Sequence, residues 1–130
     1  MYARSMHSGG AGAQYRAIDV TSKIEGASPH RLVAILYEEL VQALSTMKLA
    51  IRRVDSLRQR DAQARVLLIV QSLDSSLDFS RGGEIASALS SVYSEVRRLT
   101  LLGGKGQDAD AIDRGQKLIA EIAEAWNQIG

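Results

Sequence analysis

The segment SPHRLVAILYEELVQALSTMKLAIRRV, from Ser28 to Val54, decides the fold of this chain because it encodes one long amphipathic helix. Ser28 can cap that helix with its hydroxyl, and Pro29 then takes the first helical position, where its missing N–H costs nothing. Apolar residues recur every three or four positions and so share one helical face. They are Val33, Leu36, Leu40, Leu44, Met47, Ile51 and Val54. A helix this long with one apolar stripe must bury the stripe against other helices.

Three further segments show the same helical period. The turn segment DSLRQRD and the Gly-rich segment GGKGQD are typical of loops, and the Gly82-Gly83 pair marks a break between them. The helices are expected over about 29–55, about 62–77 after an Asp61 N-cap, about 83–101, and from Asp108 or Asp110 to the C-terminus. Short connections favour antiparallel neighbours. We therefore expect an all-α chain, an elongated antiparallel four-helix bundle over 25–130, preceded by a flexible arm over 1–24 that carries a short helix.

The composition is that of one ordinary globular domain. Hydrophobic residues make up 45% and charged residues 24% of the 130 positions, which is enough apolar material for a real core. Cysteine is absent, which excludes disulfides and thiolate metal sites. No apolar run is long enough to insert into a membrane, and the N-terminus does not resemble a signal peptide. The expected location is the cytoplasm.

Residues that could carry chemistry do not form a recognisable site. His7 and His30 have no second ligand at helical spacing, so no metal or other cofactor is expected. Glu38 and Glu39 are interpreted as a solvated helix face, and the GGKG around Lys105 lacks the other positions of a phosphate-binding loop. Five arginines crowd one end of the bundle, but a net charge of +1 does not favour nucleic acid as a partner. They are Arg52, Arg53, Arg58, Arg60 and Arg65.

Surplus apolar surface is the remaining functional signal. On the first long helix, Leu32, Ile35, Ala43 and Ala50 lie to one side of the main stripe, and Leu118 is offset in the same way on the last helix. Each could be peripheral core. Together they indicate a shallow groove into which a partner helix could pack.

Five short motifs follow one another along the chain. They are Tyr15; Ala27-Ser28-Pro29 with Leu36-Tyr37; Arg65, Ile69-Val70, Leu73, Leu77 and Asp78; Gly82-Gly83-Glu84-Ile85-Ala86 followed by Tyr93; and the closing Ala125-Trp126. In this order and spacing, the chain resembles the FliS family of flagellar secretion chaperones. Ser28, Pro29, Tyr37, Gly82, Gly83, Tyr93 and Trp126 match family positions and are expected to be structural.

The resemblance implies a small antiparallel bundle that binds the disordered C-terminal segment of flagellin in the cytoplasm. Binding would prevent premature polymerisation and keep the subunit ready for the flagellar export-gate protein FlhA, the second expected partner. The family's N-terminal segment can cover the client surface, so Tyr15 and Ile18 are expected to act as a lid. The groove is expected on Leu32, Ile35, Ala43, Ala50 and Leu118.

Two alternatives remain open. The stripes could serve only the chain's own core or a homodimer, which would make it a structural or regulatory bundle. An enzyme or cofactor carrier is disfavoured because inward histidines, cysteines and paired carboxylates are lacking.

Overall fold

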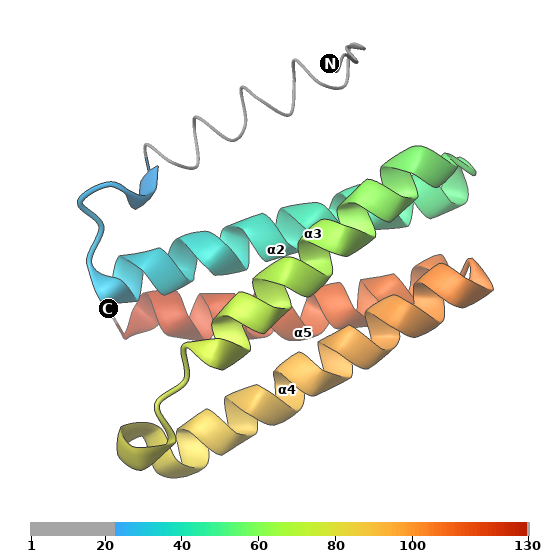
Figure 1. Cartoon of the computed structure of the whole chain (residues 1–130). Helices are drawn as coiled ribbons and strands as arrows, with labels where there is room; N and C mark the ends of the chain where they lie inside the picture. The colour runs from blue at the N-terminus through green and yellow to red at the C-terminus, as the bar shows by residue number, and fades with distance from the viewer. Residues whose placement is uncertain (1–22, 130) are drawn as a thin grey trace.

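A computed structural model describes residues 23–129, and four long helices account for most of them. With the labels of Figure 1, these are α2 (Pro29–Arg52), α3 (Ser56–Ser75), α4 (Phe79–Gly106) and α5 (Ala109–Gln128). No strand occurs within residues 23–129. The predicted all-α fold is therefore confirmed. The predicted arm, over 1–24, lies outside the described residues except for its last two.

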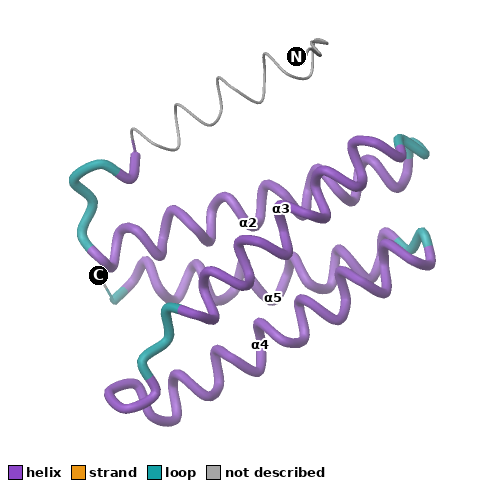
Figure 2. The backbone as a smooth tube through the Cα atoms, in the orientation of Figure 1, coloured by secondary structure: helices purple, strands orange, loops and turns teal. Residues whose placement is uncertain are grey.

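The helices alternate in direction and pack in a ring. α2 lies against α3 and α5, and α4 lies against the same two helices. Short loops join α2 to α3 and α4 to α5 at one end, and the α3–α4 loop lies at the other, near the start of α2 and the end of α5 (Figures 1 and 2). An up-down arrangement follows from connections too short to cross the bundle.

Side chains fix the helix starts. The Ser28 hydroxyl accepts a hydrogen bond from the Arg31 amide at 3.1 Å, and Pro29 occupies the first turn, as the sequence predicts. The second helix differs from its prediction, because Asp55 is the N-cap and accepts from the Arg58 amide at 3.2 Å. α3 therefore begins at Ser56, and Asp61, the predicted cap, lies inside it.

The first long helix ends three residues earlier than predicted. α2 stops at Arg52, and Val54 then adopts the left-handed region with φ of 55°. The Asp55 amide donates to the Ala50 carbonyl at 2.9 Å, which closes the helix end. Val54 is 79% exposed, so its place in the predicted apolar stripe is wrong.

The Gly-rich segment after Leu102 is helical, whereas the sequence predicts a loop. α4 continues through Gly103 and Gly104 to Gly106 and ends at Gln107, whose φ of 53° is left-handed. A Cβ at Gly103 would lie 2.5 Å from Ile112 Cδ1 and 2.9 Å from the Asp108 carbonyl oxygen. Glycine is thus present because α5 begins against this part of α4, and packing overrides the low helix propensity.

The Gly82-Gly83 pair forms a kink that separates one helical turn from the continuous part of the third helix. α4 begins at Phe79, after an Asp78 N-cap, and its helical geometry is interrupted at Gly83, where φ is 48° and ψ is −119°. A left-handed φ at this position favours glycine. The predicted break is therefore confirmed, and the continuous part of α4 begins after it, near residue 83 as predicted. The single turn from Phe79 to the kink was not predicted.

The bundle interior is apolar except for a few satisfied polar groups. The core is formed by Tyr37, Leu40, Leu44, Met47, Val66, Leu73, Tyr93, Val96, Ile112 and Ile119, together with their neighbours. Glu39 is only 4% exposed, and Arg65 Nη2 donates to its Oε1 at 2.9 Å. The predicted solvated face is thus wrong at Glu39, which joins α2 to α3 through an ion pair.

Candidate binding groove

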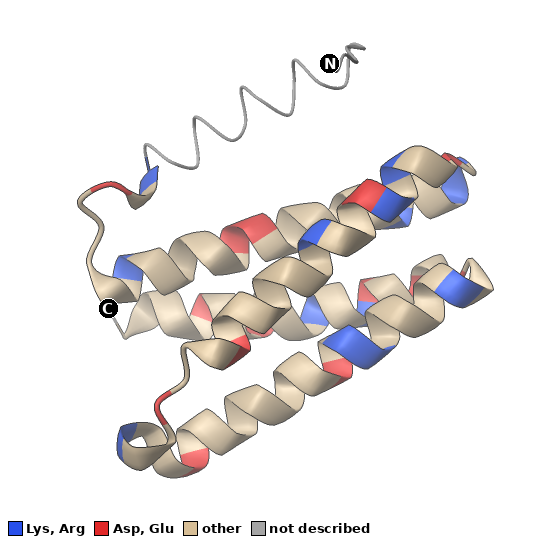
Figure 3. Ribbon diagram, in the orientation of Figure 1, with Lys and Arg blue, Asp and Glu red and all other residues tan. Residues whose placement is uncertain are grey.

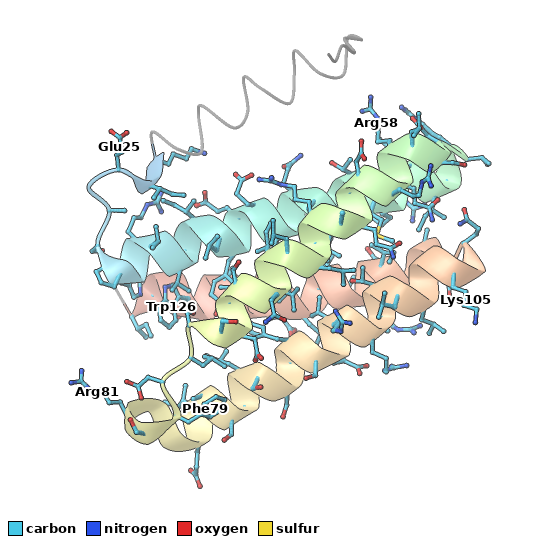
Figure 4. All side chains as sticks on the ribbon, in the orientation of Figure 1. Glu25, Arg58, Phe79, Arg81, Lys105 and Trp126 are labelled. Atoms are coloured by element: carbon cyan, nitrogen blue, oxygen red, sulfur yellow. The ribbon has the colours of Figure 1, made fainter. Side chains whose placement is uncertain are left out.

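An apolar groove of about 320 Å³ opens between α3 and α4 at the end of the bundle that carries the α3–α4 loop. In Figure 4 this end is marked by the labels of Phe79, Arg81 and Trp126. Its apolar lining comes from all four helices and consists of Val33, Tyr37, Leu73, Leu77, Ile85, Ala86, Leu89, Tyr93 and Trp126. Ser76, Asp78, Arg81 and Gly82 complete it. Hereafter these residues are called the apolar groove.

Two buried tyrosines, Tyr37 of α2 and Tyr93 of α4, form part of the lining. Their hydroxyls lie 2.7 Å apart and hydrogen-bond to each other. Burial is the main cause that raises the pKa of both phenols. Both therefore stay neutral at physiological pH, and the mutual hydrogen bond satisfies these polar atoms within the bundle. The surface offered to a ligand remains mainly apolar.

Trp126 connects the last helix to the first. Its ring stacks on His30, with centroids 4.6 Å apart and planes 7° apart, and it meets Tyr37 edge-on at 6.2 Å. Trp126 Nε1 donates to the His30 carbonyl at 2.9 Å, and His30 Nε2 lies 3.0 Å from the Trp126 carbonyl oxygen. These contacts hold the end of α5 against the start of α2, so this wall of the apolar groove is anchored at both helices.

Exposed apolar side chains border the groove on α4. Ile85 is 71% and Phe79 53% exposed, although both are large and hydrophobic. Gly82 also requires a small residue, because a Cβ there would lie 2.9 Å from the Ala86 Cβ. The kinked start of α4 thus presents apolar side chains beside an apolar hollow, an arrangement that fits the apolar face of a partner helix.

Three of the predicted groove residues are not on the surface. Ile35, Ala43 and Ala50 are 0%, 4% and 1% exposed, so the predicted exposed groove along this side of α2 is wrong for them. Ala43 borders α3, which shows that the small residues let a helix of the same chain pack closely. Leu32 and Leu118 are half-buried, and Leu118 packs against the core. The predicted lid residues, Tyr15 and Ile18, lie outside the described residues.

Several residues of the apolar groove are predicted by the sequence as members of core stripes. Leu73, Leu77, Ile85 and Leu89 have helical spacing that a buried stripe would also have. One signal could have located the groove, since Leu77 and Ile85 flank the Gly-Gly break on either side of a loop. Apolar residues beside a turn are the hardest for a bundle to cover with its own helices.

Neither a metal-binding cluster nor a membrane-spanning helix occurs in the part of the chain that the structure describes. Within residues 23–129, no three His, Cys, Asp or Glu side chains gather as a metal site would require. None of the described helices has the length and apolarity that crossing a membrane would require.

The fold and the groove define a class, namely a small antiparallel helical bundle with an open apolar groove at one end. Comparisons with known proteins give the family. The family model for the flagellar protein FliS matches residues 11–130. The chain therefore belongs to the FliS family, and the similarity noted in the sequence is confirmed.

Relatives named as flagellar secretion chaperones cover most of the chain. The FliS of Salmonella typhimurium is 34% identical over 116 residues, which span 88% of this chain and 86% of the relative. The FliS of Vibrio cholerae is 31% identical over 116 residues, 88% of this chain and 85% of the relative. The FliSB of Pseudomonas aeruginosa is 24% identical over 116 residues, 89% of this chain and 92% of the relative.

Proposed function

We propose that this chain is a cytoplasmic export chaperone that holds the C-terminal segment of flagellin in the apolar groove. The single observation that carries the proposal is the groove itself, an apolar hollow with exposed Ile85 and Phe79 beside it. Membership of a family whose relatives are named flagellar secretion chaperones supports the choice of client. Binding alone, without a chemical step, accounts for this function.

The size of the groove suits a releasable complex. About 320 Å³ accommodates a few large side chains from one face of a helix. Fully burying each Leu- or Phe-sized side chain stabilises by about 1.5–3 kcal/mol. Ordering a disordered client costs about 2–5 kcal/mol of that gain. A few anchors therefore bind the client firmly while leaving it free to dissociate at the export machinery, where we propose FlhA as the second partner.

The proposal is tested by calorimetric titration of the full chain with the C-terminal segment of flagellin from the same organism. The expected result is one-to-one binding with a negative heat-capacity change, the mark of apolar burial. Ile85→Glu places a charge at the groove without touching the core, and should weaken binding at least tenfold, which is about 1.4 kcal/mol.

Leu68→Glu is the matched control, because Leu68 is similarly exposed, at 66%, but lies on α3 outside the groove lining. Equal weakening by both variants would refute the groove as the client site. Concentration-dependent doubling of the mass without client binding would instead favour the homodimer that the sequence left open.

The proposed lid has its own test. If Tyr15 and Ile18 cover part of the client surface, a chain lacking residues 1–24 binds the flagellin segment more tightly than the full chain. Unchanged or weaker binding would remove the lid from the proposal and leave the groove in place.

A further inference from the structure

A second groove, of about 520 Å³, lies at the opposite end of the bundle from the apolar groove. It opens between the first turns of α3 and the last turns of α4. Figure 4 shows Arg58 and Lys105 at this end, far from Arg81, Phe79 and Trp126. The polar part of its lining consists of Ser56, Gln59, Arg60, Gln63, Lys105 and Gln107, and Leu101 and Gly104 complete it. These residues are called the basic groove below.

The charge of the basic groove has one sign. Arg60 and Lys105 line it, and no Asp or Glu does. Neither cation takes part in any of the ion pairs formed within residues 23–129. The adjoining α2–α3 turn adds Arg52 and Arg53, which are also exposed. The only acid in that turn, Asp55, is already occupied as the α3 N-cap and by Arg58, whose Nε lies 3.5 Å away.

Both signs of charge lie at this end of the bundle, as the blue and red residues of Figure 3 show. The acids beside the basic groove include Asp61 of α3 and Asp108 and Asp110 at the start of α5. The excess of positive charge is therefore confined to the groove lining, where Arg60 and Lys105 have no acidic neighbour in the lining. Cations placed in this way attract an acidic partner segment to the groove itself.

The floor of the basic groove is held by hydrogen bonds. The Gly104 carbonyl accepts from Gln59 Nε2 at 3.3 Å and from Gln107 Nε2 at 3.0 Å. The side-chain oxygen of Gln63 lies close to Gly104, in the space that a Cβ there would take. Two of the amide side chains of the groove, those of Gln59 and Gln107, are thus already held by the end of α4.

The side chains around the groove favour a peptide over nucleic acid. No aromatic residue lines the basic groove, and single-stranded nucleic acid depends on aromatic stacking for much of its affinity. Leu101 lines it instead and is 39% exposed, which suits an aliphatic side chain of a peptide. The glutamine amides and the serine hydroxyl can also form hydrogen bonds with the backbone N–H and C=O groups of a peptide.

We propose that the basic groove is a second docking site, for an acidic peptide segment of a partner protein that also carries aliphatic side chains. Carboxylates of that segment would pair with Arg60 and Lys105, and an aliphatic side chain would cover Leu101. The site is separate from the apolar groove, so both can be occupied at once. The inference does not rest on the client proposed above.

The test is a titration of the ¹⁵N-labelled full chain with a short synthetic peptide of glutamate and leucine, followed by amide chemical shifts. The expected shifts lie at Gln59, Gln63 and Lys105, and the affinity should fall as salt is raised, since exposed charges are screened. The double variant R60Q/K105Q should weaken binding about 3- to 30-fold, the range expected for two exposed ion pairs. Both residues are exposed, so the fold should survive the change.

Arg114→Gln is the control, because Arg114 is an exposed cation of α5 that does not line the groove. The proposal is overturned if R114Q weakens binding as much as R60Q/K105Q, or if a peptide with glutamine in place of glutamate binds equally well. It is also overturned if the largest shifts fall at the apolar groove, or if an oligothymidine binds the same residues more tightly than the acidic peptide. Loss of flagellin binding in R60Q/K105Q would show that the two grooves are not independent.

Discussion

The hydrogen bond between Tyr37 and Tyr93 makes a quantitative test of how the apolar groove is built. The two hydroxyls lie 2.7 Å apart, and the two residues are 1% and 2% exposed. Replacing one tyrosine by phenylalanine keeps the ring and removes one oxygen. The other hydroxyl then stays buried without this partner, which costs about 1–3 kcal/mol. Tyr37→Phe and Tyr93→Phe should each destabilise the chain by that amount.

The double variant Tyr37→Phe/Tyr93→Phe should be less destabilised than the sum of the single variants. It removes both polar groups and leaves no buried hydroxyl unpaired, so its cost should be near zero and at most about 1 kcal/mol. The coupling free energy between the two positions should then be at least about 1 kcal/mol. Urea unfolding of the four proteins, followed by circular dichroism, measures this cycle.

High pH gives an independent measurement on the same pair. Because the pKa of both phenols is raised in the folded chain, mainly by burial, the folded state resists their ionisation. Stability from this source is fully present below the unfolded tyrosine pKa of about 10 and is lost as the pH rises above it. The double variant should lose less stability there than the parent. A coupled buried pair would be refuted if the destabilisations of the two single variants add up to that of the double variant and the double variant loses as much stability at high pH as the parent.

Three further predictions concern stability and can be measured by the same urea unfolding. Gly115→Ala should stabilise the chain by about 1 kcal/mol, because the new Cβ would lie at ordinary contact distances in a helix interior. Gly103→Ala should instead destabilise it by about 1–3 kcal/mol, because the new Cβ would overpack against α5. Changes in stability of the same sign for both variants would contradict the packing of α4 on α5. Val54→Gly should stabilise by about 1 kcal/mol, since it relieves a branched residue at φ of 55°, and a loss of stability would mean that the exposed Val54 side chain makes a contact in solution. Hydrogen bonds from Lys48 and Lys117 lower the pKa of Asp113, so their stabilisation should be present above the unfolded pKa of about 3.9 and be lost as the pH falls through the folded pKa. Asp113→Asn should therefore be less stable than the parent at neutral pH and equally stable in acid. A constant difference in stability across that pH range would show that the Asp113 carboxylate is not the source of the stabilisation.

Local signals in the sequence determined the helices themselves. Ser28 and Pro29 can be read as a helix start because capping and the proline ring act within one turn. The apolar stripe of α2 likewise predicts burial, because helical period alone places its members on one face. The antiparallel bundle then follows from loops that are too short for any other connection.

The ends of the helices were decided by the tertiary structure. The sequence predicts Asp61 as the cap of the second helix, whereas Asp55, a residue of the same type, caps it in the structure. GGKGQD is typical of a loop, yet Gly103 and Gly104 are helical, and the start of α5 occupies the space that a Cβ at Gly103 would need. Such contacts join residues distant in the chain, and no local pattern contains them.

The location of the apolar groove depends on the same kind of information. Ala43 and Ala50 have the small side chains of a groove, yet both are buried, and Ala43 lies against α3 of the same chain. Leu77 and Ile85 have the spacing of core residues, and they line a groove because α3 and α4 meet at a kinked turn that no further described helix covers. The sequence alone determined that this chain forms helices with more apolar surface than one face can bury. Only the packing of those helices decided which part of that surface stays open, because exposure depends on what the other helices leave uncovered.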